Sequence, residues 1–193
     1  MKKAILLGII ILLAVSNAIG QHKKVLALEA FDKVQIDGNI RLYLEQGAEA
    51  IVGLEVKKEQ YFDDYKIVVR HNTLYVTLRD KPVNTAPKLK MYLTHPALKG
   101  IDIDGLVHVN SVDPVTGESF YIKGDGYIRG TVAVDVQKLG VDLDGFCSMS
   151  FSGKADISDF RLDGMGRINA RELETSEVYK RAEGLASIKG PTY

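Results

Sequence analysis

Five acidic residues, each followed by glycine, recur along the C-terminal half of the chain at spacings of 21, 19, 19 and 20 residues. They are Asp104, Asp125, Asp144, Asp163 and Glu183. If each repeat adds one strand to a stack, neighbouring carboxylates lie about 4.8 Å apart and repel by roughly 1 kcal/mol in water. An oxygen-rich row of this kind suits weak Ca²⁺ binding, and no other cofactor is expected. The alternative is turn chemistry, in which the Asp side chain bonds nearby backbone while Gly takes a positive φ. Three basic residues two positions before an acid offer charge relief and favour that alternative: Lys123, Arg161 and Arg181.

The residue after each of these glycines is apolar. The row consists of Leu106, Tyr127, Phe146, Met165 and Leu185. Strict alternation along a strand places these side chains outward, as an apolar stripe that suits a partner, a sugar or a second copy of the chain. The alternative is that the corner reverses the alternation, so that the row packs inside.

Catalytic chemistry finds little support. The four histidines, His22, His71, His95 and His108, share no metal-ligand spacing with one another or with Cys147. Cys147 falls on a predicted core position, which indicates a buried and inert thiol. No nucleophile, phosphate-loop or zinc motif is present. The enzyme alternative is a polysaccharide lyase, which needs basic residues over an acid-binding groove; Arg129 and Arg167 are equivalent in alternate repeats, without an assigned partner.

The flanks of the acidic-Gly pairs predict the elements that carry these rows. Positions two and four residues after each glycine are apolar or glycine, whereas the positions between them are mostly polar. This alternation predicts strands with one buried face on both sides of each corner. Asp-Gly also favours a two-residue hairpin turn, but equal side-chain classes at a constant period indicate stacked coils. We therefore predict an all-β chain, a single-stranded parallel β-helix with coils of about twenty residues over 101–190.

The N-terminal half, residues 25–100, is predicted to be a more irregular β region of the same domain. Asp37-Gly38 lies between alternating apolar residues and indicates an earlier corner of the same kind. The segment 67–78 predicts a hairpin that turns at His71-Asn72-Thr73. Pro82 to Pro87 is a predicted loop, and no Gly-, Ser- or Pro-rich linker separates the halves. One continuous domain is expected over residues 21–193.

The first twenty residues have the order of a secretory signal peptide. Lys2 and Lys3 precede an apolar run from Ala4 to Val15, and small residues lead to a cut after Gly20. The run is too short to span a bilayer, which takes about twenty residues. We expect a secreted, periplasmic or cell-surface protein with no transmembrane segment after cleavage.

Composition limits the partners. Without Lys2 and Lys3 the chain has 25 − 2 = 23 basic residues against 25 acidic ones, so its net charge gives no reason to expect nucleic acid. The lone Cys147 excludes an internal disulfide framework. A cell-surface glycan, an envelope protein and a second copy of the chain remain the candidate partners.

The chain resembles a known family through a pattern of many positions, each of which is only weakly diagnostic by itself. The order is Phe31-Asp32-x-Val34-x-Ile36-x-Gly38, Leu42-x-Leu44-x-Gln46-Gly47, Leu74-x-Val76, then Leu93-Thr94-x-Pro96-x-Leu98. It is similar to the putative auto-transporter adhesin head GIN domain family of bacterial exported proteins, over nearly the whole mature chain. The resemblance implies a pectin-lyase-like parallel β-helix that acts in adhesion or surface binding without enzymatic activity. The family carries Gly-Ser-Gly-like corners where this chain has mostly Asp-Gly, so no corner function is carried over.

We expect an exported, non-enzymatic binding or adhesion domain of the bacterial envelope. The alternatives are a lyase-like, polysaccharide-active enzyme and a self-assembling structural protein of the envelope.

Overall fold

The computed structural model describes residues 21–80 and 82–191; the predicted signal peptide, residues 1–20, lies outside the described residues. The described chain is all-β, with eleven strands and one short 3₁₀ helix. The strands are β1 (His22–Ala27), β2 (Lys33–Gln46), β3 (Ile51–Val56), β4 (Tyr65–Arg70), β5 (Thr73–Leu78), β6 (Leu89–His95), β7 (Gly100–Ser111), β8 (Val115–Leu143), β9 (Phe146–Leu162), β10 (Met165–Ala182) and β11 (Leu185–Lys189), and the helix is η1 (Glu59–Phe62). No helix in this part of the chain is long and apolar enough to cross a membrane.

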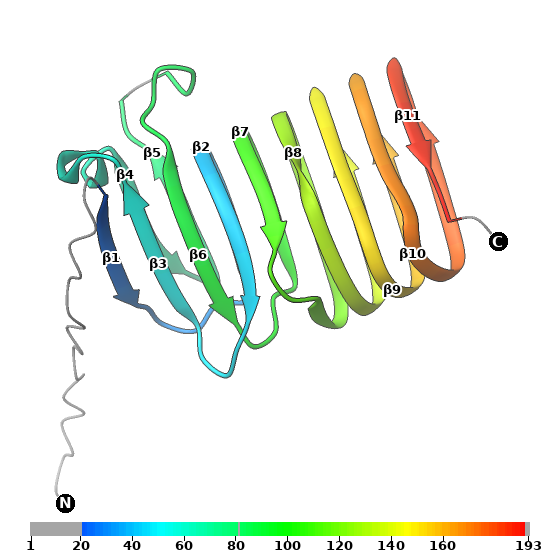
Figure 1. Ribbon diagram of the computed structural model, residues 1–193, viewed down its shortest axis with the longest axis horizontal. Helices are drawn as coiled ribbons and strands as arrows, with labels where there is room; N and C mark the ends of the chain where they lie inside the picture. Colours follow the sequence, from blue (N-terminus) through cyan, green and yellow to red (C-terminus); the bar gives the residue numbers. More distant parts are fainter. Residues whose placement is uncertain (1–20, 81, 192–193) are drawn as a thin grey trace, which may run out of the picture.

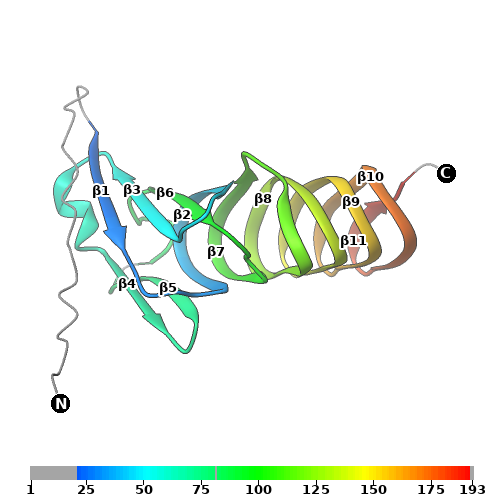
Figure 2. The ribbon, with the colours of Figure 1, turned by 90° about the horizontal axis from the view of Figure 1, so that it is seen from below.

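The strands form one long sheet (Figure 1) with the order β1-β3-β6-β2-β7-β8-β9-β10-β11. From β6 to β11 every neighbouring pair is parallel. The alternative interpretation, in which the Asp-Gly pairs form the turns of a row of antiparallel hairpins, is therefore wrong. Seen from below, β7 to β11 follow one another as similar curves along the long axis (Figure 2).

The repeat predicted from the sequence sets the register of this sheet. Gly38 pairs with Gly105, and Gly105 with Gly126, so Asp37-Gly38 is an earlier corner, as predicted. In the later coils the residues that follow the corners pair in the same way, from Tyr127 through to Leu185. Each repeat thus advances the sheet by one strand.

The prediction of two strands per repeat is only partly right. The strands β7 and β8 run through their first corners without interruption, whereas the last three corners separate β8, β9, β10 and β11. The glycine φ angle is 118° at Gly105 and 114° at Gly126, against 89°, 98° and 74° at Gly145, Gly164 and Gly184. The ladder is interrupted only where the glycine departs furthest from an extended backbone.

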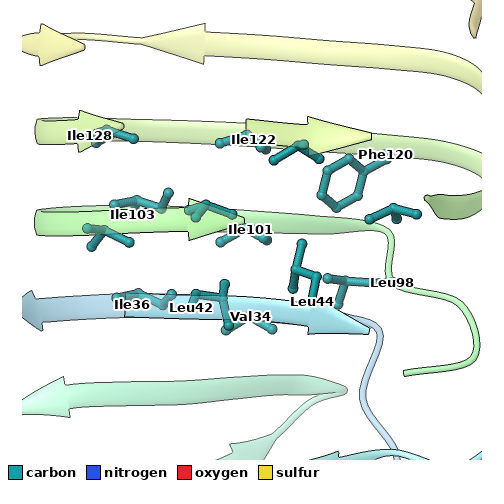
Figure 3. Packing of buried hydrophobic residues seen from close by; sticks show 14 of the residues in the cluster. Val34, Ile36, Leu42, Leu44, Leu98, Ile101, Ile103, Phe120, Ile122 and Ile128 are labelled. Atoms are coloured by element: carbon teal, nitrogen blue, oxygen red, sulfur yellow. The ribbon is translucent and has the colours of Figure 1, made fainter. Parts of the chain in front are cut away.

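The core consists of apolar rows that cross the strands. Val34, Ile101 and Ile122 pair across β2, β7 and β8 and are completely buried; Figure 3 shows their side chains on the same side of the strands as those of Ile36 and Ile103. Burial of each such side chain contributes roughly 1.5–3 kcal/mol. Predicted core positions after the earlier corners are buried as well, among them Val107, Ile128, Cys147 and Met149, whereas Ala186 and Ile188 after the last corner are only half-buried.

Gly130 and Gly166 stand at predicted core positions where backbone fills the space. A Cβ on either residue would collide with a carbonyl oxygen of the neighbouring strand, that of Val109 for Gly130 and that of Cys147 for Gly166. The row is closed there by backbone contact, so the missing side chain leaves no gap.

The N-terminal half matches its predicted elements. β4 and β5 form an antiparallel hairpin, and its two turn residues, His71 and Asn72, have φ angles of 48° and 59°, as a type I′ turn requires. The loop at 82–87 is held against the first corner: the Tyr65 hydroxyl donates to the Pro87 carbonyl at 2.7 Å, and Asn39 Nδ2 donates to the Ala86 carbonyl at 3.1 Å.

Candidate functional site

A surface of three outward rows runs across consecutive parallel strands after the corners, and we call it the three-row surface. Its first row is the predicted apolar row. Leu106, Tyr127, Phe146, Met165 and Leu185 pair in register from β7 to β11. Tyr127, Phe146, Met165 and Leu185 are 37%, 47%, 46% and 76% exposed, and Leu106 is half-buried. The interpretation that the row packs inside is wrong, because the alternation continues unbroken through the corner and buries Ile128 and Cys147 instead.

Two aromatic side chains form the centre of the apolar row. The rings of Tyr127 and Phe146 stack with centroids 5.3 Å apart and planes 4° from parallel. The Arg129 guanidinium lies 5.2 Å from the centre of the Tyr127 ring, a cation–π geometry that fixes the position of the arginine. The apolar row is thereby coupled to the basic row beside it.

The second, basic row lies two residues further along each strand. In register it reads Arg41, His108, Arg129, Ser148, Arg167 and Ser187. The pKa of His108 is lowered, first by burial and then by the positive charges of Arg41, Arg129 and Lys88. The sequence already has His108, Arg129 and Arg167 at the third position after their corner glycines. Arg41 was not grouped with them, although it stands at the same position after Gly38.

The third row is polar and completes the surface. It reads Tyr43, Asn110, Thr131, Ser150, Asn169 and Lys189. Hydroxyl and amide groups of this kind donate and accept hydrogen bonds at the same site.

Several polar atoms of the three-row surface have no partner within residues 21–80 and 82–191. Arg41 Nε, His108 Nδ1 and Asn169 Oδ1 are buried and form no hydrogen bond. An unsatisfied buried polar atom costs about 1–3 kcal/mol. The three atoms are therefore a local cost to the stability of the fold beneath this surface.

The same surface is hollowed along its length. A hollow of about 320 Å³ lies between Arg41, Lys88, His108, Tyr127 and Arg129, with Leu106 also in its wall. Two further hollows of about 300 Å³ each share Ser148, Arg167 and Lys189. Each hollow brings basic and hydroxyl groups together on neighbouring coils.

The acidic row at the corners is exposed and takes part in turn hydrogen bonds. Asp163 Oδ1 accepts from the Gly164 amide at 2.7 Å, and Glu183 accepts from Arg181 at 2.6 Å. The pKa of Asp37 is raised by burial and then by the negative charge of Asp104 on the next strand. No three His, Cys, Asp or Glu side chains of the described residues are grouped to hold a metal ion. These bonds support the turn interpretation, and Ca²⁺ binding stays a prediction.

Cys147 is completely buried, as its core position predicts. Burial raises the pKa of its thiol to about 11. The nucleophile is the thiolate, so Cys147 is protonated near neutral pH and unsuited to nucleophilic chemistry.

A different hollow, of about 620 Å³, lies at the N-terminal end of the sheet. Its walls are mostly apolar and come from β1, the segment before β2, the segment before β3, and the end of β6. It lies outside the three-row surface and contains none of the predicted site residues.

Solved structures resemble this chain in fold. A "putative adhesin" from Bacteroides fragilis has a TM-score of 0.81 and 21% identity, with 91% of this chain and 82% of that chain covered. A "putative adhesin" from Parabacteroides distasonis has a TM-score of 0.67 and 17% identity, with 87% and 80% covered. A "putative lipid binding protein" from the same organism has a TM-score of 0.60 and 14% identity, with 90% and 97% covered. No curated protein matches the chain.

A family definition gives the closer assignment. The sequence pattern of the family described as "putative auto-transporter adhesin, head GIN domain" matches residues 30–189. That range includes every strand from β2 to β11 and the whole three-row surface. The chain therefore belongs to this family, as the order of its strand motifs indicates.

Proposed function

We propose that this protein is an exported, non-enzymatic binding or adhesion domain of the bacterial envelope, which holds its ligand on the three-row surface. The observation that carries the proposal is the apolar row: four of its five side chains are well exposed, and they lie side by side on consecutive strands. Contiguous exposed apolar surface bounded by polar residues is typical of interaction sites.

We infer that the scaffold is a single-stranded parallel β-helix. The in-register parallel pairing of β2, β7, β8, β9, β10 and β11 supports this, because each repeat contributes one strand at the same position. A winding of this kind repeats each outward position about every 4.8 Å. Side chains of one type therefore form long rows, which suit an extended ligand.

Export is supported by the signal-peptide pattern of residues 1–20 and by membership of an adhesin family. The proposed sites are secreted, periplasmic or cell-surface. The lack of enzymatic chemistry is supported by the buried, protonated Cys147 and by the turn hydrogen bonds of the acidic row.

The test removes the aromatic centre of the apolar row. The double variant Tyr127→Ser/Phe146→Ser loses an exposed stacked pair worth about 0.5–1.5 kcal/mol, so we expect Tm to fall by roughly 2–6 °C. Binding to bacterial envelope preparations, measured by co-sedimentation, is expected to fall at least about tenfold, a loss of roughly 1.4 kcal/mol.

Tyr179→Ser is the control, because Tyr179 is an exposed tyrosine outside the three rows, with a larger exposed fraction than Tyr127. It should leave binding unchanged. A double variant that keeps full binding, or a Tyr179 variant that loses it, would contradict the assignment of the surface. A collapse of Tm in the double variant would mean that these rings belong to the core.

A further inference from the structure

We propose that the three-row surface binds an anionic polysaccharide lengthwise, with the basic row pairing with its acidic groups and the apolar row contacting its sugar rings. This inference rests on the proposed function, because it names the ligand class of the same surface.

The first step concerns charge. Within residues 21–80 and 82–191, Arg41, Arg129 and Arg167 form no ion pair, whereas two other arginines of the coils do: Arg161 binds Asp159 at 3.2 Å and Arg181 binds Glu183 at 2.6 Å. The groups that act on His108 by charge are all positive. The chain as a whole is balanced, so this local excess of positive charge is a property of the surface.

The second step concerns spacing. Arginine occupies every second position of the basic row, at Arg41, Arg129 and Arg167, with His108 and Ser148 between them. With adjacent strands about 4.8 Å apart, consecutive arginines lie roughly 10 Å apart. That separation is on the scale of two sugar units. It suits a polymer that carries an acidic group on alternate sugars.

The third step concerns the groups beside the arginines. A guanidinium pairs with a carboxylate or sulfate through two parallel hydrogen bonds. The polar row next to it offers hydroxyl and amide groups from Thr131, Ser150 and Asn169. Sugar hydroxyls both donate and accept hydrogen bonds, so they suit these groups.

The aromatic geometry disfavours single-stranded nucleic acid, the other common polyanion. Bases bind such proteins by stacking on exposed ring faces. The faces of Tyr127 and Phe146 are turned toward each other, and Arg129 lies over the Tyr127 ring. A ligand can therefore contact mainly the apolar edges of the two rings, and these edges suit the C–H groups of a sugar.

The experiment measures the affinity of the protein for four polymers by isothermal titration calorimetry. The polymers are hyaluronate, which carries a carboxylate on alternate sugars, chondroitin sulfate, which carries the same carboxylates and sulfate groups besides, neutral dextran, and poly-dT. We expect binding of at least one acidic glycan that weakens as NaCl is raised, and no comparable binding of dextran or poly-dT. A preference between the first two shows whether sulfate groups add to the recognition of the carboxylates.

The variant Arg129→Gln/Arg167→Gln should weaken acidic-glycan binding at least about tenfold, since hydrogen bonds to charged groups contribute about 1.5–3 kcal/mol each. The control Lys138→Gln/Lys154→Gln removes the same charge from two exposed positions outside the three rows, and its affinity for the acidic glycan should stay within about twofold of that of the unmodified protein.

Equal losses of affinity in both variants, equal binding of poly-dT, or no binding of either acidic glycan would overturn the inference. In each of these cases the proposed function stands if Tyr127→Ser/Phe146→Ser still abolishes binding to the envelope; loss of that effect too would mean that both have failed.

Discussion

His95 is a buried titratable side chain whose hydrogen bonds fix its tautomer. Its Nδ1 accepts from the Ala97 amide at 2.9 Å, so its Nε2 donates to the Phe31 carbonyl. The ring also contacts the Phe31 ring, with centroids 5.0 Å apart. Burial lowers the pKa of His95, although the Phe31 carbonyl and the Asp32 charge oppose the shift. The folded protein therefore holds this imidazole neutral.

A lowered folded-state pKa predicts that stability is lost toward acid. The unfolded chain takes up a proton near the ordinary histidine pKa of 6.5, while the folded chain takes it up only at lower pH. The contribution of His95 is thus complete above about pH 6.5 and declines below it. We expect the free energy of unfolding, measured by urea titration, to fall between pH 7 and 5.

His95→Gln should flatten this slope even though it lowers stability at pH 7. His108, whose pKa is also lowered, should contribute a second part of the slope that His108→Gln removes. His71 is exposed at the β4–β5 turn, and His71→Gln serves as the control. A slope that is the same in His95→Gln as in the unmodified protein would contradict the account.

At the scale of the element, the unit is one sequence repeat rather than one strand. Tyr127 and Phe146 are equivalent positions, and so are Ile128 and Cys147. Residues 127–145 make one whole repeat of 145 − 126 = 19 residues, which the proposed β-helix would wind as one coil. Their removal joins Gly126 to Phe146 and leaves every later row in register.

Deletion of residues 127–145 is therefore expected to give a folded, cooperative protein with reduced stability, because a repeat array loses one unit and its interface. Deletion of residues 127–136 removes about half a coil and should abolish folding, because it breaks the register of every later row. Circular dichroism with thermal unfolding distinguishes the two. If both deletions unfold the protein, or both leave it folded, the coil is not the repeating unit.

The periodic part of the chain could be predicted from the sequence because the same local pattern determines the strands and the buried positions of every repeat. The acidic-Gly spacing and the alternation around it identified the register, the buried positions such as Ile128 and Met149, and the members of the apolar row. The inward or outward direction of that row stayed open, because a corner glycine can either keep or reverse the alternation. Backbone geometry decides this, and here it keeps the alternation.

The remaining parts of the fold and of the site depend on contacts between segments that are distant in the sequence. The antiparallel pairing of β1 with β3 and of β3 with β6 joins residues that share no repeat. Arg41 was not grouped with the other basic residues because it lies on β2, more than sixty residues before His108 and outside the regular spacing of the later repeats; the β2–β7 pairing makes the two neighbours.

At the scale of the whole molecule, the sheet is a long scaffold whose core occupies one side of each strand and whose three rows occupy the other. The apolar, basic and polar rows all extend from β7 to β11, and the basic and polar rows begin on β2. An extended ligand can contact several coils at once, so many weak contacts add up along one face. This is the geometry expected of an adhesive surface.

Hydroxyl-radical footprinting tests this claim most directly, because it oxidises exposed Tyr, Phe and Met side chains. The protein is labelled alone and again when bound to a bacterial envelope preparation, and oxidation is read residue by residue by mass spectrometry. We predict that Tyr127, Phe146 and Met165 are labelled in the free protein and protected in the bound one, while Tyr179 is labelled equally in both. Protection of Tyr179 with continued labelling of Tyr127, Phe146 and Met165 would contradict the three-row surface as the binding site.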